Sequence, residues 1–448
     1  MAGRSKYGRL ARIGGLTSKV SSSYLGQRLK GAFQSREQRE SALRRLHLSN
    51  AEQVVGTMGA LKGAAMKIGQ SLAVLADGME LPPEIGQIMG KLYDGGEPVA
   101  FEEIKATVSA ELGGLADFSH IDPEPLGTAS LAQAHAAVLS DGSPAVVKVL
   151  HEGVADSVDT DIAALRTIFM AGRFLNRSKE EIELVFSEIH ERLLEELDYP
   201  RELANLVYFH RKLAPLDGIS SPRPFPSLCT DRVLVMERMT GGNLDSFLQS
   251  ATPTARQRAG DVLTSSFHEM LYVLRSLHAD PHGGNYLFRS DGSIALIDFG
   301  CIRHFTPFFV AEYSRIGDCA VAGDRKGLLD TSRQMGILLP GSPSADDAFW
   351  RFCMVIAKPF HAGSYRLGGP EDRLREELDS VVREVLRHPE IRSVRELVYL
   401  HRALGGIYAM LRRLGHEGSY GEIRSRYARH AIDVADGRKR DTGWYEGS

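Results

Sequence analysis

Apolar and polar positions alternate along the chain with two different periods, and the change of period predicts which parts are helix and which are strand. Helical spacing predicts a helix from Phe101 to Leu112, which Gly113 and Gly114 would stop. The stretch from about Asp156 to Lys212 has the same spacing and predicts two helices with a break near Asn176. Helices are therefore expected on both sides of a shorter strand-forming part.

That strand-forming part contains segments of alternating or continuous apolar character. Ala129 to Leu139 is followed by Asp141-Gly142, a strong hairpin-turn signal, and then by a second strand from Pro144 to Leu150. Arg232 to Met239 predicts a further strand. These segments predict a small antiparallel sheet.

The second half of the sequence is predicted to be mainly helical. Thr254 to Leu277 has helical spacing, and two short strands, Tyr286 to Phe288 and Ser293 to Asp298, follow it. Everything after about Pro307 predicts helices, with breaks near Pro340, Pro359 and Gly415.

Composition places the chain among soluble globular proteins. It has 448 residues, of which 43% are hydrophobic and 25% are charged, and a net charge of -3, which argues against a nucleic-acid partner. The four cysteines are scattered, with no CxxC pair, and no signal peptide precedes them. Reduced thiols and a cytoplasmic location are therefore expected.

Two segments bear on membrane contact. Val54 to Ala76 is apolar, but it contains Lys62 and Lys67, and a lysine in mid-membrane costs roughly 2.5–3.5 kcal/mol, so a membrane span is not expected. Residues 1–48 are basic and carry interspersed apolar residues. They fit either a segment on an anionic membrane surface or a solvated, partly disordered tail, and the second interpretation is slightly favoured.

Three polar residues carry the strongest chemical signal. The segment His278 to Asn285 reads HADPHGGN, and Ile297 to Gly300 reads IDFG. Phosphoryl transfer needs a carboxylate near the attacking hydroxyl and two oxygen ligands for Mg²⁺, and Asp280, Asn285 and Asp298 would supply them in that order. Each residue alone is explained equally well by turn chemistry, but the ordered set is much harder to obtain by chance.

Lys148 lies in the middle of the predicted strand AVVK, where a kinase has the lysine that pairs the nucleotide phosphates. A snorkelling strand lysine would give the same pattern. Glu195, Glu196 and Asp198 are candidate carboxylate partners, although an ordinary solvated helix face would also contain them. Before the hairpin, at the place of a Gly-rich loop, the chain has PLGTASLAQAH, whose backbone N–H groups would have to cradle the phosphates.

These motifs, with LKGAAMKIGQ and ELDYPREL, occur in the order found in the UbiB-type, or AarF-related, atypical kinases, which this chain resembles from about residue 50 to about residue 305. The resemblance implies an α+β, bilobal, protein-kinase-like fold that is predominantly helical and has an N-terminal helical extension carrying a KxGQ motif. The expected parts are the basic segment 1–48, the KxGQ extension 49–115, the N-lobe 116–240 and the C-lobe 241–448.

The resemblance also implies a role for individual residues. Lys148 would pair the phosphates with Glu196 as its ion-pair partner, Asp280 would be the catalytic-loop carboxylate, and Asn285 and Asp298 would bind the metal. The remaining expected positions are Gly127, Thr128, Ala129 and Ser130 of the phosphate loop, Glu237 and Met239 of the adenine-binding hinge, Lys67, Gly69 and Gln70 of the KxGQ motif, Asp198 as the second acid of an ExD motif, and Glu202 as the glutamate that engages the KxGQ region.

The chain departs from the family pattern in Gly127-Thr128, where Ala-Ala is usual, and in Gly283, where proline is usual. The expected function is an ATP-dependent (or ADP-dependent) kinase or ATPase that uses Mg²⁺ and is linked to ubiquinone or other isoprenoid lipids, with an isoprenoid or phenolic lipid as partner and peripheral contact with an anionic membrane. The alternatives are a nucleotide-gated regulatory module with negligible phosphotransfer, and a small-molecule phosphotransferase of the antibiotic- or choline-kinase type.

Overall fold

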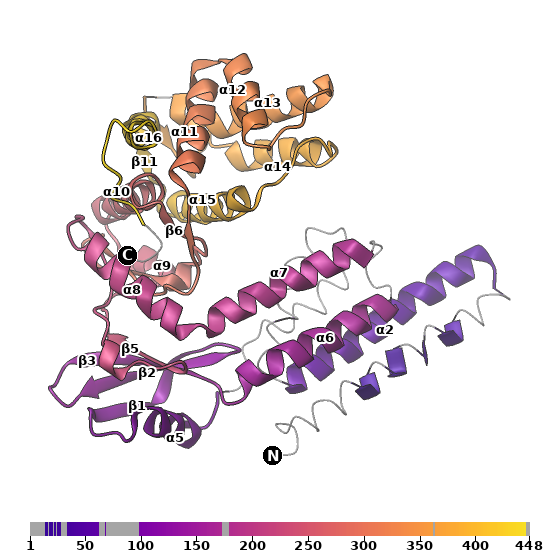
Figure 1. Ribbon diagram of the computed structural model, residues 1–448, viewed down its shortest axis with the longest axis vertical. Helices are drawn as coiled ribbons and strands as arrows, with labels where there is room; N and C mark the ends of the chain where they lie inside the picture. The colour runs from indigo at the N-terminus through magenta and orange to yellow at the C-terminus, as the bar shows by residue number, and fades with distance from the viewer. Residues whose placement is uncertain are drawn as a thin grey trace. The chain divides into compact units, whose positions relative to one another are not determined.

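The computed structural model describes residues 34–61, 98–172, 179–361 and 363–444, together with Ile68 and short pieces between residues 14 and 27. The chain divides into two compact units. Unit 1 is Met1–Ala204 with Pro224–Arg238, and unit 2 is Asn205–Arg223 with Met239–Ser448. Each unit is described by itself (Figure 1).

Unit 1 contains a four-stranded sheet with the order β1-β2-β3-β5. Its strands are β1 (Phe118–Thr128), β2 (Ala132–Leu139), β3 (Pro144–Leu150) and β5 (Val233–Glu237), and every neighbouring pair is antiparallel. The hairpin predicted from Asp141-Gly142 and the strand near residue 235 are confirmed. The strand β1 was missed, because its sequence FSHIDPEPLGT lacks regular alternation and contains two prolines.

One face of this sheet is covered by α5 (Phe101–Leu112), which ends at Gly113 with a φ of 70° as predicted. Ile104 and Val108 of the helix form one core cluster with Val147 and Val149 of β3. Because successive side chains of a strand alternate between faces, Lys148 lies on the other face. There the buried neighbours include Leu150, Tyr199 and Leu234.

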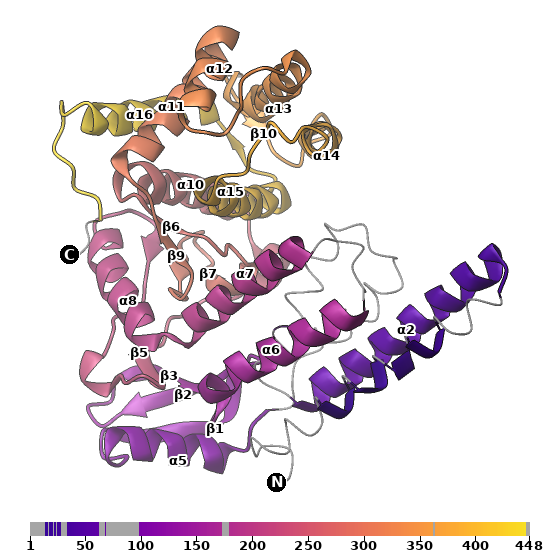
Figure 2. The same ribbon diagram turned by 45° about the vertical axis from the view of Figure 1, so that its right-hand side comes forward.

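The helices of unit 1 that follow the hairpin are α6 (Val154–Gly172), α7 (Lys179–Leu197) and the start of α8 (Tyr199–Leu213), and α2 (Arg36–Leu61) precedes the sheet. Figure 2 shows α6 and α7 side by side. The sequence predicted two helices over this stretch. The structure has a third, because a new helix begins at Tyr199, and the break predicted near Asn176 falls outside the described residues.

Unit 2 is mainly helical, and its described residues form small sheets ordered β4-β8-β7, β6-β9 and β10-β11. Its first part consists of β4 (Ile219–Ser220), α9 (Leu244–Ser250), α10 (Pro253–His268), the π-helix η2 (Glu269–Val273), β6 (Ser276–His278), the 3₁₀ turn η3 (Gly283–Asn285), β7 (Tyr286–Phe288), β8 (Ile294–Leu296) and β9 (Ile302–His304). The two short strands around the turn at Asp291 are confirmed. The helix predicted to reach Leu277 ends earlier, because the chain enters β6 there.

The second part of unit 2 consists of α11 (Pro307–Ala322), α12 (Arg325–Gln334), α13 (Pro343–His361), β10 (Tyr365–Arg366), α14 (Leu374–Val385), α15 (Arg395–Leu414), β11 (Glu417–Gly418) and α16 (Tyr420–Ala435). The predicted breaks near Pro340 and Gly415 are confirmed. The break at Pro359 is wrong, since this proline lies in the last turn of α13 and the helix continues for two more residues. Near a C-terminus a proline removes a single helical hydrogen bond, which packing can offset.

The described elements show whether a helix could cross a membrane. Among the residues described, no helix combines the length and the apolar character that crossing a bilayer requires. Much of Val54 to Ala76 and of the basic segment 1–48 lies outside the described residues, as do Lys67, Gly69 and Gln70 of the KxGQ motif.

Candidate active site

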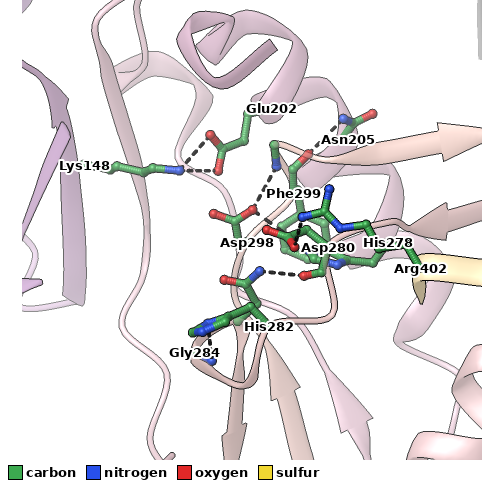
Figure 3. Close-up of polar contacts among 12 residues, drawn as sticks. Lys148, Glu202, Asn205, His278, Asp280, His282, Gly284, Asp298, Phe299 and Arg402 are labelled. Carbon is green, nitrogen blue, oxygen red and sulfur yellow. Dashed lines mark hydrogen bonds and ion pairs between the residues drawn. The ribbon is translucent and has the colours of Figure 1, made fainter. Parts of the chain in front are cut away.

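Lys148 is the candidate phosphate-binding residue of unit 1, and it lies on an inner strand of the sheet. Its strand, β3, is hydrogen-bonded to β2 on one side and β5 on the other, so the backbone of Lys148 is fixed by both neighbours. The side chain leaves the sheet on the face opposite α5 and reaches Glu202 (Figure 3). Such a position holds the ammonium group in one place, as nucleotide recognition requires.

The partner of Lys148 in the structure is Glu202, and the assignment of that role to Glu196 is corrected. Lys148 Nζ lies 2.8 Å from Glu202 Oε1 and 2.9 Å from Oε2. The Glu202 side chain is only 4% exposed, and that of Lys148 is 22% exposed. Tyr199 adds a ring face whose centroid lies 5.4 Å from the same ammonium nitrogen.

A local helix boundary explains why Glu202 pairs with Lys148, where the resemblance implied Glu196. Asp198 ends the preceding segment, and its Oδ1 accepts a hydrogen bond from the backbone N–H of Arg201 at 2.9 Å, as an N-cap does. Helix α8 therefore starts afresh after α7, and Glu202 lies in its first turn. Glu196 belongs to the exposed end of α7. Asp198, expected to be the second acid of a motif, has this capping role in addition.

The predicted phosphate loop is shorter than the sequence suggested. Gly127 and Thr128 are still part of β1, paired with Ala134 and Gln133 of β2. The turn itself contains Ala129 and the buried Ser130, and the Ala129 N–H donates to the Ala132 carbonyl at 2.8 Å. That N–H group is thus used by the turn, so any phosphate contact has to come from the other groups of this segment.

The predicted hinge is at one of the places where the chain passes from one unit to the other. Glu237 is the last residue of β5, and its partner across the sheet is Ala145 of β3. The second segment of unit 1 ends at Arg238, and the second segment of unit 2 begins with Met239. An adenine-binding role for Glu237 and Met239 stays a prediction.

In unit 2, the strand β6 leads directly into the segment that carries Asp280. Backbone hydrogen bonds fix this segment, since the His282 N–H donates to the Asp280 carbonyl at 2.7 Å and the Asn285 N–H donates to the His282 carbonyl at 2.9 Å. The side-chain Nδ2 of Asn285 donates to the same Asp280 carbonyl at 2.9 Å. That bond also fixes the orientation of the Asn285 amide, which leaves its Oδ1 as the acceptor end.

Asp280 itself forms an ion pair that the sequence did not predict. Arg402 of α15 places its Nη2 2.7 Å from Asp280 Oδ1 (Figure 3), and both side chains are 41% exposed. The pair therefore lies at the surface of unit 2, within reach of solvent and salt. Arg402 is 122 residues away in sequence, so nothing local could have indicated it.

Asp298 lies beside a buried histidine and a tightly packed phenylalanine. Asp298 Oδ1 is 3.9 Å from His278 Nε2 and accepts the Gly300 N–H at 3.2 Å. Burial lowers the pKa of His278, so its imidazole is neutral at pH 7. Phe299 is 1% exposed, packs on Phe209 at 5.5 Å between ring centroids, and its carbonyl accepts a bond from Asn205 of α8 at 3.0 Å.

The oxygen atoms of this segment fit a hard divalent cation. Mg²⁺ prefers a few carboxylate and amide oxygens and keeps several waters or phosphate oxygens as its other ligands. Asn285 offers its Oδ1, and Asp298 offers its carboxylate. The neighbouring His278 is neutral, so it places no positive charge beside the Asp298 carboxylate that would oppose a bound cation. The donor set of unit 2 is therefore of the right chemical kind for Mg²⁺ held against phosphates.

Sequence reasoning missed Arg402 and Asn205 and gave Glu202 another role. The Glu202 assignment had a usable signal, because Asp198 followed by Pro200 is a typical start of a helix. Arg402 and Asn205 had none, since each acts on a segment that is distant in the chain.

Comparisons with known proteins show the family and the fold of the chain. A family model described as the ABC1 atypical kinase-like domain matches residues 91–332. A solved structure of the Rv3197–erythromycin complex from Mycobacterium tuberculosis is similar with a TM-score of 0.60 and 22% identity, over 86% of this chain and 97% of that one. The fold is kinase-like, with mixed helix and sheet.

The chain belongs to the ABC1 atypical kinase-like family, as the UbiB-type motifs predicted. Atypical kinase COQ8, mitochondrial, from Saccharomyces cerevisiae is 27% identical over 376 residues, which cover 82% of this chain and 74% of that protein. Atypical kinase COQ8B, mitochondrial, from Rattus norvegicus is 29% identical over 422 residues, which cover 92% and 78%. Membership in a family of atypical kinases implies nucleotide binding and phosphotransferase or ATPase activity.

Proposed function

We propose that the protein binds Mg·ATP and either hydrolyses it or transfers its γ-phosphoryl group to a small isoprenoid or phenolic lipid. The acceptor class follows from the family resemblance, which links such kinases to ubiquinone and related lipids. The observation that carries the proposal is the catalytic segment of unit 2, where Asn285 is fixed on the Asp280 backbone and the oxygens of Asn285 and Asp298 form a Mg²⁺-type donor set.

Each residue would then have a stated task. Mg²⁺, bound by Asn285 and Asp298, would neutralise charge that develops on the phosphate oxygens. Lys148, fixed by Glu202, would offer a further positive charge to the phosphates. Asp280 would accept the proton of the attacking hydroxyl or water, for which its carboxylate has to leave or share the ion pair with Arg402.

The test is phosphate release from Mg·ATP by the purified wild type and by Asp280→Asn, with and without anionic liposomes. We expect turnover to fall at least about 100-fold in the variant, in line with loss of a general base. Stimulation by liposomes would support peripheral contact with an anionic membrane. ADP formation in excess of phosphate release would indicate transfer to a lipid acceptor, because transfer frees ADP but no phosphate.

Two further variants make the outcome specific. Asp217→Asn is the matched control, because this side chain is 95% exposed in the same unit and turnover should not change. Asp298→Asn should abolish Mg²⁺-dependent nucleotide binding. Unchanged binding in Asp298→Asn would reject the metal assignment, and nucleotide binding without turnover in the wild type would instead indicate a nucleotide-gated module.

A further inference from the structure

A cavity lies in the helical part of unit 2 and is lined by α10, η2, α11, α13, α15 and α16. Figure 1 shows α10, α11, α13, α15 and α16 in one group. Its volume is about 100 Å³. Protein interiors contain few voids larger than one water molecule, and an apolar cavity of comparable size, roughly 150 Å³, is known to bind benzene. Because this void is smaller than that one, it suits an organic molecule no larger than benzene.

The wall of the cavity is almost entirely aliphatic and aromatic. Phe349, Ile356, Leu400 and Leu404 are typical of it. The charged group in the wall, Arg424, is 6% exposed and already neutralised, because its Nη1 donates to Asp318 at 2.8 Å and its Nη2 to the Ser314 carbonyl at 2.7 Å. A second buried charge would find no compensation here.

Two histidines in the wall are also uncharged at neutral pH. Burial lowers the pKa of both His268 and His401 to about 4. The Nδ1 of His268 lies 2.7 Å from the Thr264 carbonyl. The interior is thus electrically neutral and suits a neutral occupant.

Three tyrosines give this apolar wall a polar spot. Tyr272, which is buried, and Tyr313 and Tyr408, which are partly buried, line the cavity. Within the described part of the chain no hydrogen bond is found for their hydroxyl groups. Burial raises the pKa of each phenol, so all three stay protonated and keep an O–H donor. The three hydroxyl groups are therefore available to donate a hydrogen bond to a molecule in the cavity.

The backbone at this wall is unusual in the same place. Leu271 and Tyr272 belong to the π-helix η2, which directly continues α10. Insertion of a π-helical turn costs regular hydrogen bonding and is found mostly at functional sites. Here it contributes Tyr272 to the cavity.

We propose that this cavity is a binding site for a small neutral molecule with an apolar body and one hydrogen-bond acceptor, such as a short aliphatic alcohol. The apolar body would contact the aliphatic and aromatic wall, and the oxygen would accept a hydrogen bond from the tyrosine hydroxyls. The site is distinct from the catalytic segment and does not depend on nucleotide.

Calorimetric titration of the full chain with three related probes tests this chemistry. The probes are butan-1-ol, pentane and butanoate, each of them no larger than benzene in number of heavy atoms. We expect saturable binding of the alcohol with one molecule per chain, binding of the hydrocarbon about five-fold weaker for the lost hydrogen bond, and binding of the anion at least about 100-fold weaker, because its charge is unpaired in the cavity.

Variants localise the binding. Leu404→Trp fills the cavity and should weaken the alcohol at least ten-fold, whereas Val398→Trp on the same helix, at a position 41% exposed, should leave it unchanged. The triple change Tyr272→Phe, Tyr313→Phe and Tyr408→Phe keeps the rings and should make alcohol and hydrocarbon bind equally. Absence of saturable binding to the folded wild type, or equal binding to Leu404→Trp, would overturn the proposal.

Discussion

Lys148 and Asp280 each have an ion-pair partner, but the two pairs are built differently. Glu202 contacts Lys148 with both carboxylate oxygens and is 4% exposed. Arg402 contacts one oxygen of Asp280, and both of these side chains are 41% exposed. The first pair joins a central strand to a helix, whereas the second is made at the surface of unit 2.

The difference matches what each residue is expected to do. A cation that pairs phosphates benefits from a fixed position, and loss of one partner of a buried pair is costly because the other charge is left uncompensated. A carboxylate that accepts a proton has to become available, and an exposed pair is worth only about 0–1 kcal/mol. Breaking the Lys148 pair is thus costly, while the Asp280 pair can open during turnover at little cost.

The largest expected effect comes from Glu202→Gln, which removes the charge that compensates Lys148. We expect the free energy of unfolding to fall by about 3 kcal/mol, as for other buried pairs that lose one partner. Mg·ATP binding should weaken as well, since Lys148 would no longer be held in place. Urea unfolding and nucleotide titration measure the two effects.

Glu196→Gln is the matched control for that change. It is exposed at the end of α7, so the stability should change by less than about 0.5 kcal/mol. If Glu196→Gln destabilised the protein more than Glu202→Gln, the contrast between the two pairs would be wrong, and the original sequence assignment of Glu196 would have to be restored.

The same contrast shows what the sequence could predict. Elements with a local signal were predicted well, such as the hairpin at Asp141-Gly142 and the helix stop at Gly113, and Lys148 lies in the strand where it was expected. Asp298 was expected at the end of a strand but lies two residues beyond β8. Local turn and cap chemistry depends on neighbouring residues, which a sequence displays directly.

Contacts between distant segments could not be predicted. Which of Glu196 and Glu202 faces Lys148 depends on where α7 ends and α8 starts. A shift of a helix start by two residues turns every side chain of that helix to the opposite face. Arg402 and Asn205 reach the catalytic segment only because helices from other parts of the chain pack there. Such packing is decided by the whole fold rather than by a local pattern.

A smaller effect is expected from Gly406→Ala, which tests whether backbone packing rather than the ion pair positions the catalytic segment. A Cβ atom at Gly406 of α15 would lie 2.2 Å from Cγ of Pro281, next to Asp280. We expect a loss of about 1–3 kcal/mol in stability from overpacking. Phosphate release should fall about ten-fold, because the Asp280 segment is displaced.

Its neighbour supplies the control, since a Cβ atom at Gly405 would meet nothing within 4 Å. Gly405→Ala should therefore stabilise α15 by about 0.5–1 kcal/mol and leave turnover unchanged. Thermal unfolding and phosphate release of both variants test whether the contact with Pro281 positions Asp280. Equal turnover in the two would mean that contact with Pro281 does not position Asp280.

The smallest effect is expected from Arg402→Gln, which removes the partner of Asp280 and leaves the rest of α15 unchanged. Because the pair is exposed, stability should change by less than about 1 kcal/mol. The freed carboxylate should raise phosphate release by up to about five-fold at low salt, the factor that corresponds to such a pair. At high ionic strength the phosphate-release rates of the variant and the wild type should converge, since salt screens the pair.

Arg413→Gln on the same helix is the control, because it removes the exposed pair with Asp245 and should change neither stability nor phosphate release. A fall in turnover for Arg402→Gln would instead mean that Arg402 takes part in binding the phosphates, and the Asp280 pair would then belong to the catalytic machinery rather than restrain it.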